Sequence, residues 1–430
     1  MPSPADSISE ASRTTPVRGR HDIIIAGGGP AGYAAALGAA RAGASVLVLE
    51  QAGCLGGIWT AGLLPWIIDQ HTRGGIMGEL RDYILNQAGG TLVGTTLGLD
   101  PELLKLRLET DLAQAGVRLR YNTMLTAVSK GDDGRTVTHA ITESKAGREA
   151  WQARLFIDCT GDGDLAARAG CGFDYGNEQG LAQPTSIGVI VTGIDPDRLE
   201  AELPRAVRKP KLCEMLREGG LEPSYALPGF GYLGHGLFIS GGTHQYNRRF
   251  DDPDALTAAL MEARAEVHRH IEIFRRRGGL WADLRLLGTA SALGIREARR
   301  IHGRATVTID DIVAGHCPPR TVCVSHFGLD VHAPDPQRCR GIDKPLDLRP
   351  RPYGIPWEAL VARDCDNLLM AGRCISGDFL AHSSYRVTGT AVALGEGAGR
   401  GAALALQRGV QPAALTDQDL ATFTADLADQ

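Results

Sequence analysis

Residues His21–Glu50 read HDIIIAGGGPAGYAAALGAARAGASVLVLE, and this stretch decides the fold. Asp22–Ala26 is a short apolar run that predicts a buried strand. The alanine-rich segment Ala34–Ala42 predicts a slim helix that can lie close to a sheet, and Gly43 ends it. A second apolar run, Ser45–Leu49, predicts the next strand. Strand, glycine turn, helix and strand in this order predict a βαβ unit with parallel strands.

Three glycines in the turn fit the pattern G-x-G-x-x-G. Gly27 permits the tight turn, Gly29 lets the backbone approach a pyrophosphate, and Gly32 lets the helix touch the strand. The following helix offers free N–H groups and the positive end of its dipole to phosphates. Glu50 lies 18 residues after Gly32, where a carboxylate accepts hydrogen bonds from ribose hydroxyls. The stretch therefore predicts a dinucleotide site rather than a glycine-rich turn without a ligand.

The size and charge of the chain fit a globular enzyme. Its 430 residues suffice for one large domain or two closely packed ones. The hydrophobic share of 43% and charged share of 22% are ordinary for that class. The net charge is −5 and the pI about 6.2, so no overall basic field attracts nucleic acid or an anionic membrane. We expect a small-molecule partner, no nucleic acid and no membrane, with the oligomeric state open.

Neither end of the chain nor its cysteines predict export. No run of about 18 apolar residues occurs, so no membrane span is expected. Residues 1–20 are polar, lack the apolar core of a secretory signal and predict a disordered tail. The nine cysteines include no C-x-x-C pair, and Cys54 has no partner in the next 100 residues, which argues against a thiol–disulfide relay. We expect a cytoplasmic protein with mostly buried, reduced cysteines and no metal site.

The loop after the second strand carries a second glycine approach point. Gly56-Gly57 can pass beneath a diphosphate or the edge of a ring system, and Trp59 and Thr60 follow in a glycine-rich segment. An ordinary loop is the alternative. Further on, His71 and Arg73 precede a helix expected over about residues 75–87, and each faces either a substrate or the surface.

The far end of the chain returns to the first unit. Residues 366–375, DNLLMAGRCI, predict a buried strand that ends in a glycine. The helix that starts near Val387 has small residues on all sides, which suits burial against a sheet and a cofactor, with its N-terminus at a ligand. No second G-x-G-x-x-G followed by an acid occurs. Because the far end of the chain returns to complete the first unit, and because the Gly56-Gly57 doublet extends the phosphate site, the sequence favours FAD over NAD.

The sequence resembles the FAD-dependent oxidoreductases related to succinate dehydrogenase and fumarate reductase flavoproteins, with a glutathione-reductase-type FAD fold. The matching pieces span about Asp22 to Leu406. They are GGGPAG with Glu50, CLGGIWTAG, DCTGDGDLAARAG, GIREARRIHGRATVTIDDI, DVHAP, YGIPWEALVARDCDNLLMAGRCIS and HSSYRVTGTAVALGEGAG. One departure is Ser325–Leu329, where relatives have a glycine-rich Tyr-Pro stretch. Some branches attach the flavin through a histidine, and His71 is the candidate near the flavin loop.

The resemblance implies a set of FAD contacts. The first glycines would hold the pyrophosphate and Glu50 the ribose, backbone near Leu125 would touch adenine, and the return segment would meet the ribityl chain and the pyrimidine edge of the flavin. A positive charge or dipole there stabilises reduced, anionic flavin. The predicted cofactor-binding residues are Gly27, Gly29, Pro30, Ala31, Gly32, Glu50, Gln51, Gly56, Gly57, Trp59, Thr60, Leu125, Thr160, Gly161, Asp162, Gly372, Arg373 and Thr390.

The predicted fold class is α/β: a Rossmann-like FAD-binding domain with a parallel sheet and an inserted α+β substrate domain. The expected layout is a tail over 1–20, the FAD-binding domain over 21–170 and 352–410, the substrate domain over 171–351, and a C-terminal tail over 411–430. Within the insertion we expect strands at 185–192, 236–241, 306–308 and 321–324 and one long helix after Asp252-Pro253.

Four residues are candidates for the chemistry. His382 and Arg386 precede the buried helix: the histidine can accept a proton as hydride leaves to the flavin, and the arginine can bind a carboxylate or stabilise flavin charge. His235 and His244 come from the substrate domain and would close over the ring. Each histidine has a structural alternative, as a core, loop or backbone-bonded residue. Glu297 and the nearby arginines are expected to form buried ion pairs.

Three functions remain open from the sequence. The main prediction is a flavin dehydrogenase or oxidase that transfers hydride between a small polar alcohol, amine or C–C bond and FAD, with O2 or another electron acceptor. The second is a flavin monooxygenase or halogenase-like tailoring enzyme of a biosynthetic pathway. The third is a flavin-binding protein for assembly or electron relay.

Overall fold

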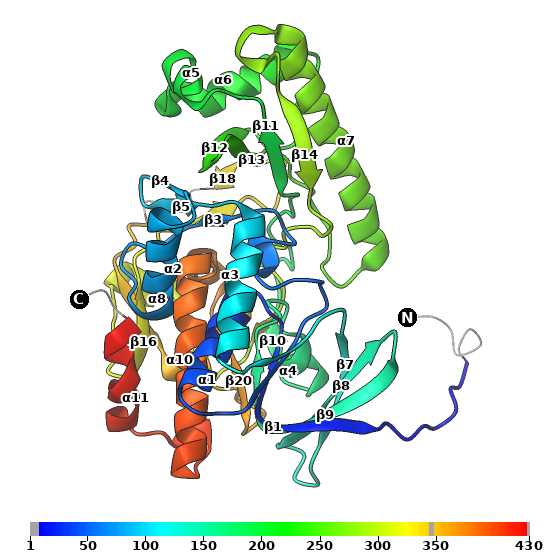
Figure 1. Cartoon of the computed structure of the whole chain (residues 1–430), viewed down its shortest axis with the longest axis vertical. Helices are drawn as coiled ribbons and strands as arrows, with labels where there is room; N and C mark the ends of the chain where they lie inside the picture. Colours follow the sequence, from blue (N-terminus) through cyan, green and yellow to red (C-terminus); the bar gives the residue numbers. More distant parts are fainter. Residues whose placement is uncertain (1–7, 344–347, 428–430) are drawn as a thin grey trace.

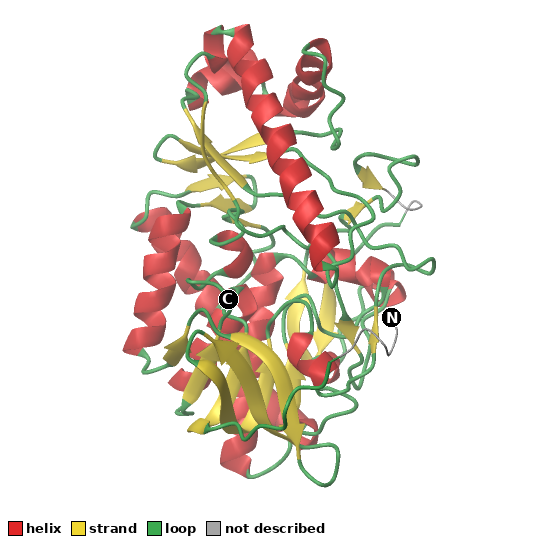
Figure 2. Cartoon of the chain, turned by 90° about the vertical axis from the view of Figure 1, so that its right-hand side faces the viewer, coloured by secondary structure: helices red, strands yellow, loops and turns green. Residues whose placement is uncertain are grey.

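The computed structural model describes residues 8–343 and 348–427. The first and last residues of the two expected tails, and 344–347 of the proline-rich connector, lie outside the described residues. The chain forms a broad lower part around one large sheet and a narrower upper part that ends in a long helix (Figure 1). Figure 2 shows that this helix, α7 (Pro253–Arg277), runs along the side of the upper part down toward the lower one.

A seven-stranded sheet forms the centre of the lower part, with the order β6-β2-β1-β9-β8-β7 and β20 also paired with β9. β1 (Val17–Ala26) runs parallel to β2 (Val46–Leu49) on one side and to β9 (Gly147–Asp158) on the other. β6 (Arg118–Arg120) and β20 (Leu368–Met370) add further parallel neighbours. The predicted α/β class with a parallel sheet is confirmed, and β20 comes from the return segment.

The outer part of this sheet is antiparallel. β7 (Met124–Lys130) pairs with β8 (Val137–Ser144), which pairs with the first half of β9. The second half of β9 pairs with β20 instead. β1 begins at Val17, so the strand includes the last residues of the segment expected as a tail.

Two helices that are far apart in sequence cross in direct contact over the sheet. α1 (Pro30–Arg41) is the alanine-rich helix of the opening unit, and α10 (Thr388–Arg408) is the helix of the return segment (Figure 1). A Cβ on Gly399 would lie 2.1 Å from the Ala35 carbonyl oxygen, so only glycine permits this approach. This contact places the N-terminus of α10 on the same side of the sheet as the N-terminus of α1.

The segments between β2 and β9 cover the sheet and carry clear start signals. α2 (Gly75–Asn86) matches the predicted helix to within one residue. α3 (Pro101–Gln114) begins as expected, with Asp100 accepting a hydrogen bond from the Glu102 N–H and Pro101 in the first turn. The remaining elements there are η2 (Gly57–Trp59), β3 (Trp66–Ile67), β4 (Thr91–Val93) and β5 (Thr96–Gly98). The short helix α4 (Asp164–Arg168) follows β9.

The upper part is built on a second, antiparallel sheet with the order β12-β13-β11-β14. One face of this sheet packs on α7, where Phe230, Phe274 and Trp281 form an aromatic group inside a separate hydrophobic core. Its elements are β11 (Val189–Thr192), α5 (Pro196–Glu202), α6 (Arg205–Glu218), β12 (Gly229–Gly234), β13 (Leu237–Gly241), η3 (Gly279–Trp281) and β14 (Arg285–Thr289).

After β14 the chain passes back along the lower core. The strand expected at 306–308 is wrong: Thr308 caps α8 (Ile309–Ala314) in a capping box with Asp311, and a hydroxyl that caps a helix favours a turn. β16 (Thr321–Ser325) confirms the strand expected at 321–324. The short strand β15 (Arg300–Ile301) pairs with β10 (Phe173–Asp174), which lies earlier in the chain. Further elements after β14 are β17 (Val331–His332), β18 (Ile342–Asp343), β19 (Tyr353–Pro356), η4 (Trp357–Ala359) and α9 (Phe379–Tyr385).

The C-terminal segment packs on the lower core. α11 (Asp417–Thr424) follows η5 (Pro412–Ala414) and starts with a capping box formed by Thr416 and Asp419. Its residues Leu420 and Phe423 are buried against α10. η6 (Ala425–Leu427) ends the described chain.

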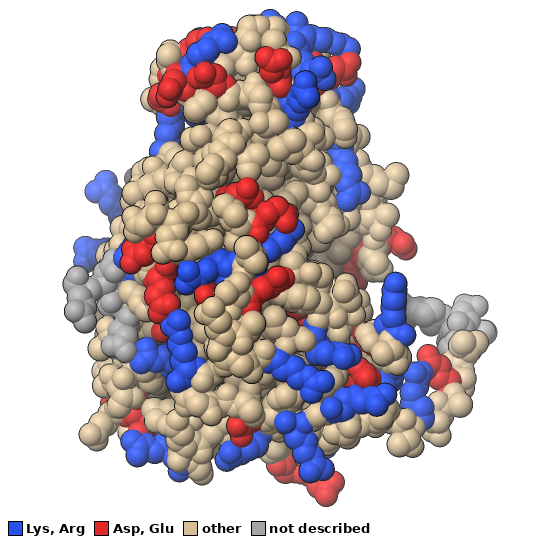
Figure 3. All heavy atoms as spheres, viewed as in Figure 1, with Lys and Arg blue, Asp and Glu red and all other residues tan. Residues whose placement is uncertain are grey.

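Figure 3 shows acidic and basic side chains together over the upper end, where α5, α6 and α7 lie. No helix within 8–343 and 348–427 is both long and apolar enough to cross a membrane.

Candidate functional site

The glycine turn between β1 and α1 packs against the first residues of the loop that follows β9. A Cβ on Gly32 would lie 1.8 Å from the Gly27 carbonyl oxygen, so the helix could not approach the strand with a larger residue. Gly27 has a φ of +91° and lies against Cys159. Gly29 caps α1 without any side-chain hydrogen bond, and Pro30 occupies the first helical position. The first N–H groups of α1 are therefore available for an anion.

The Gly56-Gly57 doublet packs directly on this turn. The N–H of Gly56 donates to the Gly28 carbonyl oxygen at 2.8 Å, and a Cβ on Gly57 would lie 3.0 Å from Gly29 Cα. Backbone thus faces backbone, with no side chain between the two segments. In the same loop the Thr60 hydroxyl donates to the Leu55 carbonyl, and Trp59 is fully buried. The indole N–H of Trp59 has no acceptor among the described residues.

Glu50 is 7% exposed and lies beside the turn. Its Oε2 accepts from the Gly28 N–H at 2.6 Å and its Oε1 from the Ala52 N–H at 2.6 Å. Each carboxylate oxygen keeps a second lone pair for a further donor. Gln51 is exposed, and Leu125 on β7 is 8% exposed.

The loop after β9 meets the loop after β20. Arg373 forms an ion pair with Asp162 (Nη2 to Oδ1, 2.8 Å), and its guanidinium lies against Gly161. Burial raises the pKa of Asp162 although Arg373 lowers it. The neighbouring Thr160 is fixed by Asp158, whose Oδ1 accepts from the Thr160 N–H and hydroxyl at 3.0 and 2.7 Å. Gly372 packs against Ala31 at the start of α1.

The N-terminus of α10 has no side-chain cap of its own at Val387. The hydroxyl of Thr388 in its first turn is buried there and has no partner among the described residues. The Thr390 hydroxyl is committed elsewhere, because it donates to Asp69 Oδ2 at 2.8 Å. The same carboxylate pairs with Arg73, so Arg73 is buried in an ion pair while His71 is exposed.

His382 lies on α9 and is fully buried. Its ring packs edge-on against Tyr385, with centroids 5.4 Å apart. Neither ring nitrogen has a hydrogen-bond partner in the described part of the chain. Burial, together with the charges of Arg300 and Arg386, lowers the pKa of His382 well below its ordinary value. The imidazole is therefore neutral.

Arg386 directly precedes α10 and is tied to Asp330. Its Nη2 lies 2.7 Å from the Asp330 carbonyl oxygen and 3.1 Å from Oδ2. Burial raises the pKa of Asp330, but the hydrogen bond from His332 and the charge of Arg386 bring it below its ordinary value. The carboxylate is therefore ionised. The Nε of Arg386 is buried without a partner among the described residues.

A chain of hydrogen-bonding groups leads from Asp330 to the edge of the upper part. Asp330 Oδ2 is 3.3 Å from His332 Nε2, and His332 Nδ1 is 3.0 Å from His244 Nε2. His244 Nδ1 is in turn 3.2 Å from the Tyr246 hydroxyl. Burial lowers the pKa of His332 to about 4 and that of His244 further. Tyr225 packs on His244, with ring centroids 4.2 Å apart.

His235 occupies a different place. It sits in the β12–β13 turn with a φ of +51°, and its Nε2 is 3.2 Å from the Ala88 carbonyl oxygen after α2. The structure groups His244 with Asp330 and Arg386 and leaves His235 at this other contact. The expected ion pairs are present: Glu297 pairs with Arg300, and Arg299 pairs with Asp164.

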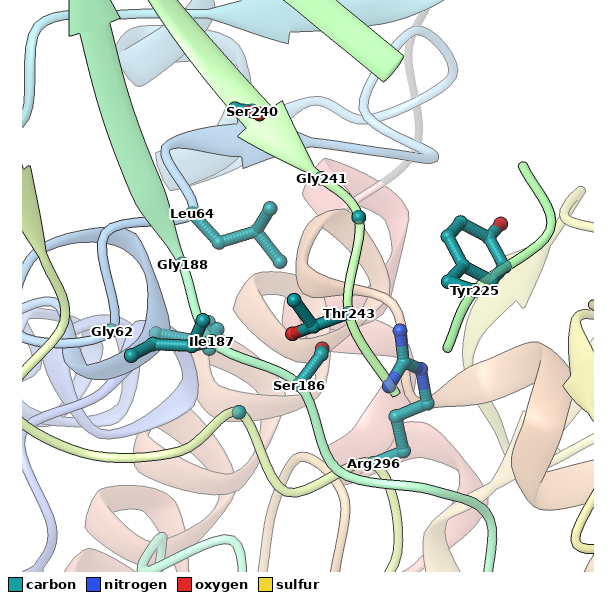
Figure 4. A pocket seen from close by; sticks show the side chains of 13 residues that line it. Gly62, Leu64, Ser186, Ile187, Gly188, Tyr225, Ser240, Gly241, Thr243 and Arg296 are labelled. Atoms are coloured by element: carbon teal, nitrogen blue, oxygen red, sulfur yellow. The ribbon is translucent and has the colours of Figure 1, made fainter. Parts of the chain in front are cut away.

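A partly enclosed cavity of about 110 Å³ lies between the loop after η2 and the upper sheet (Figure 4). In Figure 4 Ser186, Thr243 and Arg296 come from three segments around the cavity, and Tyr225 lies to the right of the segment that carries Gly241 and Thr243. The lining residues are Ile58, Gly62, Leu64, Ser186, Ile187, Gly188, Tyr225, Ser240, Gly241, Gly242, Thr243, Gly294 and Arg296.

Several of these groups were missed from the sequence. Asp330 and His332 belong to the DVHAP piece, where the Asp-x-His spacing was a usable signal because alternate residues of a strand share a face. Tyr225, Ser186 and Thr243 carry no local signal, since long-range packing alone brings them to the cavity. Within 8–343 and 348–427, no group of three or more His, Cys, Asp or Glu residues could hold a metal ion.

Several solved structures are similar to this chain, and one of them is named as flavin-dependent. A geranylgeranyl bacteriochlorophyll reductase-like protein from Thermoplasma acidophilum is 12% identical, with a TM-score of 0.51, over 94% of this chain and 82% of that one. The flavin-dependent brominase Bmp2 is 14% identical, with a TM-score of 0.48, over 95% and 83%. The p-nitrophenol 4-monooxygenase PnpA from Pseudomonas putida DLL-E4 is 13% identical, with a TM-score of 0.48, over 94% and 83%.

The family model described as FAD dependent oxidoreductase matches residues 22–427, which include the glycine turn, the return segment and both sheets. The chain therefore belongs to the FAD dependent oxidoreductase family.

Proposed function

We propose that this FAD-dependent oxidoreductase transfers hydride between a small polar organic molecule and its cofactor. The cofactor, FAD, follows from the family. When bound, FAD supplies an acceptor for a hydride or an activator of O2, and the protein supplies binding, orientation and proton transfer. The observation that carries the proposal is the partly enclosed cavity between the loop after η2 and the upper sheet.

The groups around the glycine turn fit the adenosine half of FAD. The uncapped N-terminus of α1 suits a pyrophosphate, and the buried Glu50 carboxylate suits ribose hydroxyls. The direct backbone contact of Gly57 with Gly29 leaves room for phosphate where side chains would otherwise lie. These residues would hold that half of the cofactor.

The return segment fits the other half. Thr388 is a buried hydroxyl without a described partner at the N-terminus of α10, and Arg373 keeps a buried Nη1 without one. A bound group would satisfy both donors, since buried polar groups are nearly always hydrogen-bonded. Trp59 presents a third such donor from the loop after η2. We therefore assign the ribityl and ring half to Trp59, Thr388 and Arg373.

The cavity adjoins that half through Ile58 and Gly62, which follow the glycine doublet. A substrate in the cavity would lie between this loop and the strands of the upper sheet. The lining combines aliphatic side chains with Ser186, Thr243 and Arg296, so it suits a small molecule with polar groups.

The neutral histidines supply the acid–base group that oxidation of an alcohol or amine needs. His244 lies behind Tyr225, and its proton chain ends on the ionised Asp330. A proton that enters this chain at the Tyr246 hydroxyl can pass through His244 and His332 to that carboxylate. His382 is the second candidate, because both of its ring nitrogens are free among the described residues.

Anaerobic mixing of the purified holoprotein with small alcohols, amines and hydroxy acids tests the proposal. Loss of the flavin absorbance with a substrate alone, at a rate that depends on substrate concentration, supports hydride transfer. If no such compound reduces the flavin while NADH or NADPH does so, the proposal is wrong.

A second candidate is a flavin monooxygenase or halogenase-like enzyme. The observation in its favour is that the cavity is partly enclosed by aliphatic side chains, because a site with less water protects reactive oxygen adducts from side reactions. The brominase and the nitrophenol monooxygenase bear such names, but their likeness reaches only the fold. Reduction by NADH or NADPH, followed by O2-dependent incorporation of oxygen or halide into a product, would favour this candidate. A closer kinship with succinate dehydrogenase and fumarate reductase flavoproteins rests on the quoted motifs.

A further inference from the structure

We propose that Arg296, Thr243 and Ser186 form a subsite that binds the carboxylate of an anionic substrate. The inference rests on the proposed function, because it names the substrate class of the same cavity. Its basis is the chemistry of these three side chains and the charge around them.

Arg296 is a cation that forms no direct ion pair within residues 8–343 and 348–427, although the charge of Asp330 acts on it. Its Nη1 donates to the Pro184 carbonyl oxygen at 2.7 Å, and it forms no ion pair with a described carboxylate. Burial and the neighbouring charge of Arg386 lower the pKa of Arg296 to about 10, so it remains charged at neutral pH. A guanidinium has five N–H donors in a planar fork that matches a carboxylate. The donors that Pro184 does not use are free to bind a ligand in the cavity.

The charges near Arg296 leave an excess of positive charge. The carboxylate of Asp330 acts on both Arg386 and Arg296, and Glu297, already paired with Arg300, also acts on Arg386, while His244 and His332 are neutral. The nearby Arg300 and Arg373 are already neutralised by Glu297 and Asp162. A buried charge is expensive unless it is paired, so a ligand anion would complete the set.

Thr243 supplies a second, independent indication. Its hydroxyl is buried, lines the cavity and has no hydrogen-bond partner among the described residues. Ser186 lines the same cavity from another segment, as does the Arg296 side chain (Figure 4). Two hydroxyl donors and an arginine fork make up the donor set that carboxylate oxygens accept. The walls formed by Ile58, Leu64 and Ile187 suit the apolar remainder of the ligand.

Binding to the wild-type holoprotein tests the charge requirement without any variant. Isothermal titration calorimetry with two matched pairs, acetate with acetamide and benzoate with benzamide, compares an anion with its neutral isostere. We expect at least one carboxylate to bind ten times or more as tightly as its amide, typical of a charge-assisted hydrogen bond. If neither carboxylate exceeds its amide, the inference is overturned.

Variants then test which side chains bind the carboxylate. Arg296→Gln should weaken binding of the carboxylate at least tenfold while FAD stays bound, and Arg296→Lys should restore part of it. Arg264→Gln is the matched control, because Arg264 also donates to a backbone carbonyl, that of Ala290, but does not line the cavity. Equal weakening in Arg264→Gln and Arg296→Gln would reject the assignment to Arg296. Should Arg296→Gln not fold, a Thr243→Val variant tests the same subsite with an expected loss of fivefold or more.

The two proposals fail in different ways. Reduction of the flavin by neutral alcohols or amines, with no preference for carboxylates, would refute the proposed subsite but support the hydride-transfer function. Carboxylate binding with no reduction by any small molecule would keep the subsite and remove that function.

Discussion

His244 Nε2 lies 3.0 Å from His332 Nδ1, and both imidazoles are buried. Because His332 Nε2 faces the ionised Asp330, that nitrogen carries the proton, which makes His332 Nδ1 an acceptor. His244 then donates from Nε2 and accepts from the Tyr246 hydroxyl at Nδ1. One arrangement of protons satisfies the whole chain, and it directs each donor toward Asp330.

This arrangement predicts a loss of stability in mild acid. The pKa of His332 falls from 6.5 to about 4 on folding, because burial outweighs Asp330, and Arg296 and Arg386 add to the shift. The unfolded state therefore binds the proton first. The stabilisation is complete above pH 6.5, declines as the pH falls from 6.5 to about 4 and is lost below that, with a total of about 3 kcal/mol.

The measurement is the melting temperature at pH 7.5 and pH 5. We expect a larger drop between these pH values for the wild type than for His332→Gln, which keeps hydrogen-bonding groups but does not titrate. His268→Gln is the control, since His268 is exposed on α7 and should leave the drop unchanged. Equal drops in His332→Gln and the wild type would contradict the shift.

Gly29→Val should yield folded protein without flavin. A Cβ at Gly29 would lie 4.0 Å from Gly57 Cα and would meet no closer described atom, so the fold tolerates it, whereas the branched side chain would occupy the approach to the N-terminus of α1. Gly53→Val is the matched control, because a Cβ there meets only Asn122 Oδ1 at 3.8 Å and Gly53 lies outside the turn. Flavin absorbance per protein, with circular dichroism to verify folding, decides the outcome. Full flavin occupancy in Gly29→Val would overturn the site.

The sequence was sufficient for the parts of the fold that local chemistry specifies. The turn around Gly27, the caps at Asp100 and Asp252 and the small-residue helix of the return segment were all predicted from residue types. The prediction of a strand through Thr308 failed, because a hydroxyl beside a β-branched residue fits both a strand and a helix cap. At the candidate site, Arg386 was proposed from its position before α10. Its partner Asp330 and the histidine pair depend on contacts between segments far apart in the chain, which one sequence does not encode locally.

Gly399→Ala should destabilise the protein by about 1 to 3 kcal/mol, the usual cost of overpacking. The added Cβ would lie 2.1 Å from the Ala35 carbonyl oxygen, so α10 would have to move away from α1. Gly229→Ala, where a Cβ meets only the side chain of Lys209 at 3.7 Å, is the control with the same chemical change. Chemical denaturation of the apoprotein measures both. A difference of less than about 0.5 kcal/mol between the two variants would show that the helices are not in direct contact.

Two histidine variants separate the candidates for the acid–base group. His244→Leu should retain FAD and slow substrate-driven flavin reduction by about 100-fold, typical of a lost proton acceptor, with a flattened pH profile of the reduction rate. His382 on α9 is fully buried, so His382→Leu should preserve the pH profile of the reduction rate if the residue only packs against Tyr385. Stopped-flow reduction between pH 6 and 9 gives both rates and profiles. A 100-fold loss with a changed profile in His382→Leu, together with an unchanged rate in His244→Leu, would move the role to His382, which is neutral and has no hydrogen-bond partner among the described residues.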